Sequence, residues 1–163
     1  MDKYDYIYVG GENNSFYFIT DNKIVYEVKF KDSSYLFDGR LTFPVIAFEF
    51  VLEIEENPDN VRPSLDAKIP YTVAAIFRDF FAKNDEQVII YICDSSDSRQ
   101  AIRRRKFNQW VEFFKGNEFL KIDAEIIESS KVTYYNSLIL KTNHPNRQTI
   151  IDVFISLADE QEK

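Results

Sequence analysis

The spacing of the apolar residues changes part-way along this chain, and no other feature restricts the fold as much. Over residues 1–54, apolar side chains recur at every second position, which is the period of strands that bury one face, as in Ile24–Phe30. Over residues 70–158, helical spacing alternates with short continuous apolar runs. We therefore expect one α+β domain over residues 1–163, with an antiparallel meander in 1–54 and alternating helices and strands in 70–158.

Turn residues divide these two halves into elements. Clusters of Gly, Asn and Asp separate the expected strands of the first half, and Pro70 and Pro145 open helices in the second. The expected elements are strands 4–9, 16–20, 24–30 and 43–54, helix 70–84, strand 88–93, a helix from the Asp94–Ser98 cluster to Lys115, strands 119–127 and 132–140, and helix 145–158. The order ββββαβαββα predicts a mixed, mostly antiparallel sheet of about seven strands with helices on its faces. Glu27 and Glu49 fall on the wet face of the meander.

From the second strand onward, this order resembles the topology of the acyl-CoA N-acyltransferase superfamily. In that family a strand leads into a pyrophosphate-binding turn of the pattern R/Q-x-x-G-x-G/A, which is followed by a helix. The corresponding stretch here, Asp66–Tyr71, contains no glycine to let an anion approach the backbone closely. The resemblance implies an acyltransferase-like enzyme whose cofactor turn is degenerate.

The rare residue types exclude several kinds of site. Four Gly leave no room for a Walker-A loop or a dinucleotide fingerprint. One His and one Cys are too few for the usual zinc sites, so we expect no metal and no cofactor. The formal net charge of −7 opposes broad binding to nucleic acid. The chain shows no secretory signal, no membrane-length apolar run and no disulfide partner for Cys93, which predicts a soluble cytoplasmic protein.

The densest polar feature joins the end of the expected strand 88–93 to the helix that follows it. Arg103 and Lys106 fall within the apolar arc of that helix, where an unpaired charge is costly to bury. The arc comprises Ile102, Phe107, Trp110, Val111, Phe113 and Phe114. Ligand sites often lie at strand ends beside a helix N-terminus, so we predict a site there for an anionic or peptide-like partner. Its candidate residues are Asp94, Ser96, Asp97, Arg99, Gln100, Arg103 and Lys106.

A structural interpretation of the same residues stays open. Asp97 or Ser98 would cap the helix, and Arg103 would pair with an aspartate and so lock the loop to the helix. An open crevice favours a binding site, whereas a crevice filled by its own side chains favours this lock.

The run C-D-x-S-D-x-R-Q, followed by R-x(3)-F-x(2)-W, resembles a family of small bacterial proteins of unknown function. The matching positions are Cys93, Asp94, Ser96, Asp97, Arg99, Gln100, Arg103, Phe107 and Trp110. The resemblance extends over most of the chain, with Ser98 where the family has Gly. It implies no activity and points only to a bacterial regulatory, defence or toxin–antitoxin-like setting.

Other chemistry-bearing residues have simpler structural explanations. His144 is expected to be a surface or capping histidine, and Cys93 a packed thiol. The carboxylates expected to be solvated rather than to bind metal are Glu49, Glu53, Glu55 and Glu56. The tyrosines at positions 4, 6 and 8 share one strand face, which suits either protein contacts or cross-strand aromatic pairs.

Together these observations favour a non-catalytic interaction or regulatory module with a protein partner and no membrane binding. One alternative is the acyltransferase-like enzyme. The other is an RNA-binding protein that contacts phosphates through Arg99 and Arg103–Lys106. Against RNA binding, Trp110 lies at the centre of the apolar arc and is expected in the core rather than on a base-stacking surface.

Overall fold

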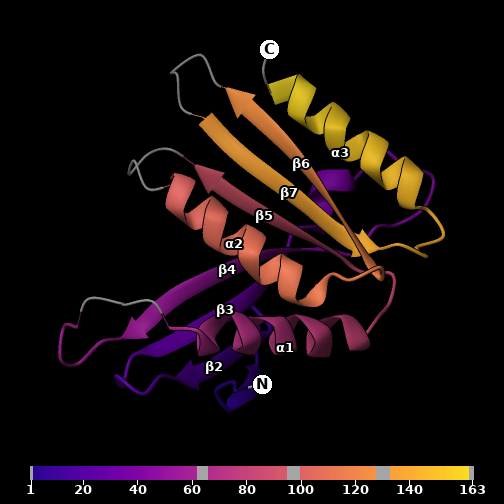
Figure 1. Cartoon of the computed structure of the whole chain (residues 1–163). Coiled ribbons are helices and arrows are strands. Elements are labelled where there is room, and N and C mark those ends of the chain that lie inside the picture. The colour runs from indigo at the N-terminus through magenta and orange to yellow at the C-terminus, as the bar shows by residue number, and fades with distance from the viewer. Residues whose placement is uncertain (1, 62–65, 95–99, 128–132, 162–163) are drawn as a thin grey trace.

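The computed structural model describes residues 2–61, 66–94, 100–127 and 133–161 of the chain. Within these residues the strands are β1 (Tyr6–Gly10), β2 (Ser15–Ile19), β3 (Val25–Asp32), β4 (Ala47–Glu56), β5 (Val88–Asp94), β6 (Phe119–Ile127) and β7 (Thr133–Lys141). The helices are the 3-10 turn η1 (Ser34–Phe37), α1 (Lys68–Ala82), α2 (Gln100–Phe114) and α3 (Arg147–Gln161). The predicted fold class and order of strands and long helices are confirmed: one α+β domain with a mixed sheet (Figure 1).

The seven described strands form one sheet in the order β1-β2-β3-β4-β5-β7-β6. Neighbours within β1–β4 and within β5–β7–β6 are antiparallel, and β4 pairs with β5 in parallel. That parallel pairing joins Ala47–Glu49 to Val88–Ile90, after which the two strands diverge, as their arrows show in Figure 1. The sheet therefore has two antiparallel halves that meet along a short seam.

Strand β4 begins four residues later than the alternation predicts. The expected strand started at residue 43, but Leu41–Ile46 is irregular and contains Pro44. Proline cannot donate a ladder hydrogen bond, so it is excluded from a central strand such as β4. The prediction was wrong here because the apolar alternation continues through a proline that the sheet cannot accommodate.

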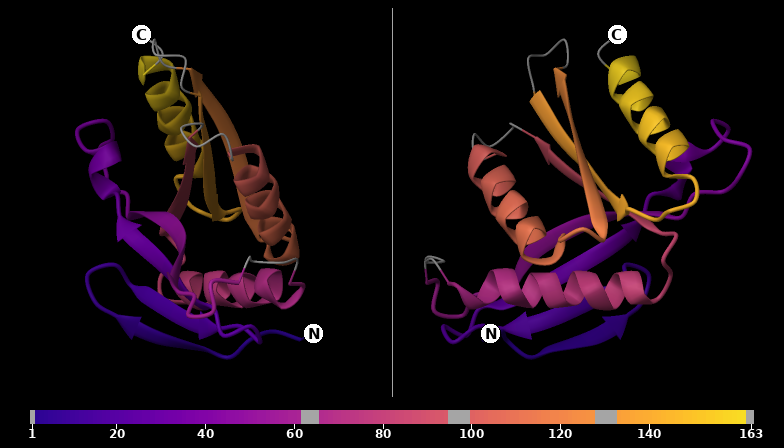
Figure 2. Two further views of the ribbon diagram at one scale, coloured as in Figure 1. Left: turned by 90° about the vertical axis from the view of Figure 1, so that its left-hand side faces the viewer. Right: turned by 45° about the vertical axis from the view of Figure 1, so that its right-hand side comes forward.

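One face of the sheet is covered by α1 and α2. The apolar positions predicted for α1, among them Ile76, Phe77 and Phe80, are buried, and the rings of Phe80 and Phe30 stack with centroids 3.8 Å apart. The opposite face is covered over β6 and β7 by α3, whose Ile150 and Phe154 share a second core cluster with Leu138 (Figure 2). No helix in the described part of the chain is long and apolar enough to cross a membrane.

The buried face of α2 differs from the predicted arc. Ile102, Phe113 and Lys106 are exposed, whereas Phe107, Val111 and Phe114 are buried as predicted. At about 100° per residue, Arg103 lies within about 40° of the direction of Phe107, and Lys106 about 100° from it. Arg103 is accordingly half-buried, and the prediction that Lys106 faces the core was wrong.

Candidate functional site

Four of the seven predicted site residues belong to described elements. Ser96, Asp97 and Arg99 lie outside the described residues, as does the predicted cap at Asp97 or Ser98. Asp94 ends β5, Gln100 begins α2, and Arg103 and Lys106 follow on α2. Of the two basic side chains, Arg103 is half-buried, and Lys106 is exposed to solvent.

The charge of Arg103 affects the phenol of Tyr91, which lies in the middle of β5. Burial raises the pKa of Tyr91 well above its ordinary value, the neighbouring Cys93 adds to the rise, and the Arg103 guanidinium opposes it. Cys93 is buried, as predicted for a packed thiol. Cys93 and Arg103 thus have opposite effects on the pKa of the Tyr91 phenol.

Aromatic side chains fill the base of the divergence between β4 and β5. Phe50 of β4 lies 5.9 Å from Tyr91 of β5, and Phe107 of α2 lies 4.1 Å from Tyr91 and 5.7 Å from Phe50, between ring centroids. Trp110 also reaches Phe50, at 6.2 Å, and is in the core as predicted. The base of this divergence is thus occupied by the chain's own side chains.

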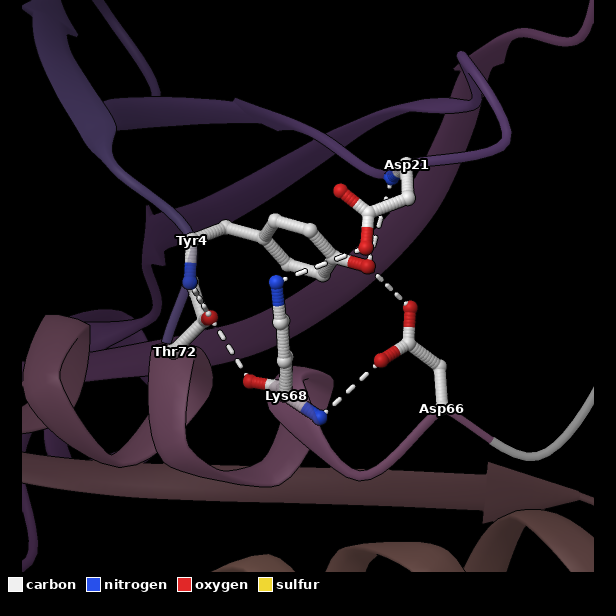
Figure 3. Close-up of polar contacts among 5 residues, drawn as sticks. All are labelled: Tyr4, Asp21, Asp66, Lys68 and Thr72. Atoms are coloured by element: carbon white, nitrogen blue, oxygen red, sulfur yellow. Dashed lines mark hydrogen bonds and ion pairs between the residues drawn. The ribbon is translucent and has the colours of Figure 1, made fainter. Parts of the chain in front are cut away.

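A second polar cluster fixes the start of α1 (Figure 3). The Tyr4 hydroxyl donates to Asp66 Oδ2 at 2.5 Å, and Asp66 Oδ1 accepts the backbone N–H of Lys68 at 2.9 Å. Thr72 Oγ1 accepts the N–H of Tyr4 at 2.9 Å and donates to the carbonyl of Lys68 at 2.7 Å. The Lys68 ammonium lies 3.4 Å from Asp21 and 5.1 Å from the centroid of the Tyr4 ring.

This cluster places a negative charge at the N-terminus of α1. Burial and the hydrogen bond to Asp66 raise the pKa of Tyr4 to about 12, so the phenol stays neutral and keeps donating. The stretch Asp66–Tyr71 is the one compared above with a glycine-rich pyrophosphate turn. Here the Asp66 carboxylate already accepts an N–H group that such a turn would offer to a phosphate.

The side of β1–β4 opposite α1 forms a third feature, which we call the open face. By register and alternation it carries Ile7, Val9, Ser15, Tyr17, Ile19, Val25, Glu27, Lys29, Lys31, Glu49, Val51, Glu53 and Glu55. Ile7, Val9 and Ile19 are 65%, 61% and 60% exposed. Register places Ile7 of β1 opposite Tyr17 of β2, so the apolar side chains of these two adjacent strands are neighbours on the open face.

Glu27 lies at the centre of the polar part of the open face. Ser15 Oγ donates to it at 2.6 Å, and the Lys29 ammonium lies 3.8 Å from it and 2.8 Å from Glu53. Burial alone would raise the pKa of Glu27, but the hydrogen bonds from Ser15 and Tyr17 and the charge of Lys29 outweigh burial and hold this pKa below its usual value. Glu27 therefore stays ionised at neutral pH.

Two expectations about polar residues need correction. Glu27 was expected on the wet face, yet it is 6% exposed, because side chains of both neighbouring strands close over it. His144 was expected at the surface or as a cap. It is buried, so the surface expectation is wrong. Its Nδ1 accepts the N–H of Asn146, the residue before α3, rather than an N–H of the helix itself.

The tyrosines at positions 4, 6 and 8 form aromatic pairs with residues of β2. Tyr4 stacks on Phe18 at 6.0 Å, and Tyr6 and Tyr8 lie 6.1 and 4.8 Å from Phe16. These rings lie on the α1 side of the sheet, and Tyr6 donates a hydrogen bond to Asp79 of α1. The contacts thus support cross-strand aromatic pairing, rather than protein contacts, as the explanation for these tyrosines.

The comparison with protein families gives one match. A family model described as "Family of unknown function (DUF6169)" matches residues 65–156, more than half of the chain. The chain belongs to this family. The predicted membership of a family of unknown function is thereby confirmed, whereas the sequence motif and the bacterial setting stay predictions. No curated protein matches the chain, and no solved structure matches it.

The DUF6169 match and the open face occupy different parts of the chain. The match begins just before α1, whereas the open face is built from residues 7–55. Within the described residues, no group of His, Cys, Asp and Glu side chains has an arrangement that could hold a metal ion.

Sequence reasoning missed the open face and the Tyr4–Asp66 contact. The first had a signal, because Ile7 and Val9 alternate with tyrosines and make β1 apolar on both sides. The second had none beyond the preference of Asp for helix starts, because Tyr4 and Asp66 are 62 residues apart.

Proposed function

We propose that this protein is a non-catalytic interaction module that binds a protein partner through the open face. The observation that carries the proposal is the high exposure of Ile7, Val9 and Ile19 on one side of adjacent strands. Contiguous exposed apolar surface is typical of protein interaction sites. Covering it contributes about 25 cal/mol for each Å² of apolar surface removed from water.

The polar side chains beside this apolar patch favour recognition of a partner protein over catalysis. Glu27 is held by Ser15 and Lys29, and Lys29 also pairs with Glu53. Of these pairs, Lys29–Glu53 is accessible, and it presents fixed charges to a partner without having to be ordered on binding, which suits a specific protein interface.

Site-specific photocross-linking tests the proposal. A photoreactive phenylalanine replaces Ile19 in one variant and Ile155 in another, and both are expressed in cells that naturally produce the chain. Ile155 is 43% exposed on α3 and serves as the matched control. We expect a discrete protein adduct from position 19 and none from position 155. Equal labelling at both positions, or no adduct at 19, would contradict the proposal.

A second candidate function is the acyl-CoA-dependent acyltransferase. It is favoured by the strand–turn–helix succession of β4 and α1, followed by parallel pairing of β4 with β5. The Asp66 carboxylate at the start of α1 and the rings that fill the base of the β4–β5 divergence count against it.

Thermal unfolding with acyl-CoA distinguishes the two functions. A ligand of the native state at 100 times its Kd stabilises the protein by about 2.7 kcal/mol. For a domain of this size, we expect such binding to raise Tm by about 5–10 °C. An unchanged Tm at millimolar acetyl-CoA rejects the acyltransferase candidate.

A further inference from the structure

The open face is divided into two strips that lie side by side. The apolar strip consists of Ile7, Val9, Tyr17, Ile19 and Val25. The acidic strip consists of the buried Glu27 together with Glu49, Glu53 and Glu55, and Lys29 and Lys31 lie within it. Register joins the strips directly, because Tyr17 lies opposite Glu27, and Glu27 opposite Glu53. The surface is therefore apolar over β1, β2 and the start of β3, and carries an excess of carboxylates over the rest of β3 and β4.

Other parts of the sheet are covered by helices. Figures 1 and 2 show α1 and α2 on one side and α3 on the other, over β6 and β7. The open face continues the surface beneath α3, since Ala47 and Glu49 pair with Val88 and Ile90 across the seam. No described helix covers the open face, so a helix docked there would extend the layer that α3 begins.

The dimensions of the apolar strip fit one helix. The strip extends from β1 to the first residue of β3, and neighbouring strands lie about 4.8 Å apart. Its width is therefore about 10 Å, close to the 10–12 Å diameter of a helix with its side chains. One flank of a helix lying along the strip would face the acidic strip on β3 and β4.

The charge of the face favours a basic partner over a second copy of this chain. Four carboxylates stand against the two amines of Lys29 and Lys31. Lys29 lies 3.8 and 2.8 Å from Glu27 and Glu53, and register places Lys31 opposite Glu49, so the face carries two more carboxylates than amines. A second copy would bring the same excess of carboxylates into the interface, whereas Lys or Arg side chains would complement it.

We propose that the open face binds an amphipathic helix of a partner protein, with apolar residues on one side and Lys or Arg along one flank. The apolar side covers Ile7 and Ile19, and the basic flank faces Glu53 and Glu55. This inference rests on the function proposed above and names the chemistry of the partner.

A peptide titration tests this inference. The probe is a fluorescein-labelled synthetic helix of about 18 residues, with Leu at i, i+3, i+4 and i+7 and Lys along one flank. A matched peptide carries Glu in place of Lys. Binding is followed by fluorescence anisotropy against the wild type, Ile19→Ser and Glu53→Lys. The control variants are Ile155→Ser and Glu112→Lys, which alter exposed side chains on α3 and α2.

We expect the basic peptide to bind the wild type and the acidic peptide not to bind. Ile19→Ser and Glu53→Lys should each weaken binding by roughly tenfold, and the two control variants by less than about twofold. Equal binding by all variants would identify non-specific attraction to an acidic protein and overturn the inference. Absence of binding to the wild type would also overturn it, as would self-association in sedimentation velocity that Ile19→Ser abolishes.

The two proposals fail separately. A cross-linked partner at position 19 together with no affinity for the basic peptide would overturn the helix inference and leave the proposed interaction function intact. No adduct at position 19 and no peptide binding would overturn both. All variants alter exposed side chains, and far-UV circular dichroism verifies that each is folded.

Discussion

Replacement of His144 by Ala is expected to destabilise the protein by about 2–3 kcal/mol. The imidazole is buried and uses both nitrogens: Nδ1 accepts the N–H of Asn146 at 3.0 Å, and Nε2 contacts the Glu86 carbonyl oxygen at 2.8 Å. Because a carbonyl only accepts, Nε2 carries the proton and donates. The ring thus joins the start of α3 to the segment before β5.

The magnitude follows from these two contacts. Loss of a side-chain hydrogen bond at a helix start costs about 1 kcal/mol. Loss of the bond to Glu86 leaves a carbonyl without this partner and costs about 1–2 kcal/mol. At about 2–4 °C per kcal/mol for a domain of this size, Tm should fall by about 5–10 °C.

Urea and thermal unfolding measure the effect, with His144→Asn as the matched control. Asn keeps an acceptor for the N–H two residues later, so it should recover about 1 kcal/mol relative to Ala while still losing the contact with Glu86. The reasoning is refuted if His144→Ala loses less than about 0.5 kcal/mol. It is also refuted if Asn is no better than Ala.

Three further substitutions test the polar clusters and the core. Glu27→Gln should cost about 1 kcal/mol at pH 7. Because the fold lowers the pKa of Glu27, this stabilisation is lost as pH falls below the unfolded-state pKa of 4.5, and the difference in urea midpoint between variant and wild type should vanish there. Tyr4→Phe should cost about 1–2 kcal/mol through the lost hydrogen bond to Asp66. Because the fold raises the pKa of Tyr4 to about 12, the difference in unfolding free energy from the wild type should be complete below pH 10 and disappear between pH 10 and 12. Phe107→Ala should cost about 3–5 kcal/mol in denaturant unfolding, and a loss below about 2 kcal/mol would mean that the β4–β5 divergence is not packed as described.

The order of elements could be predicted because it depends on local periodicity. The α1 positions Val73–Phe81 repeat at helical spacing, and their burial needs only one apolar side. Which side of α2 faces the core was harder to predict, because apolar side chains occupy a wide arc of this helix. Packing against Phe50 and Tyr91 selects the direction of Phe107 and leaves Ile102 and Phe113 exposed.

The candidate sites were less predictable because they depend on distant contacts. Glu27 is buried by Ser15, Lys29 and Glu53, which come from three strands, and no local pattern announces that arrangement. The open face depends on which side of β1 receives α1, and apolar residues on both sides of the strand leave that choice to tertiary packing. The strand order also depends on the path of the long connection from β4 to β5. The periodicity of the sequence does not determine that path.

The seam between β4 and β5 has a consequence for hydrogen exchange. The two halves of the sheet pair at three positions, Ala47–Glu49 with Val88–Ile90, whereas β3 and β4 pair at eight. Native proteins open in cooperative units whose borders follow weak connections. We therefore expect backbone amides to exchange in two kinetic groups, one for β1–β4 with α1 and one for β5–β7 with α3. The rings of Phe50, Tyr91 and Phe107 span the border, and they set how independently the two groups open.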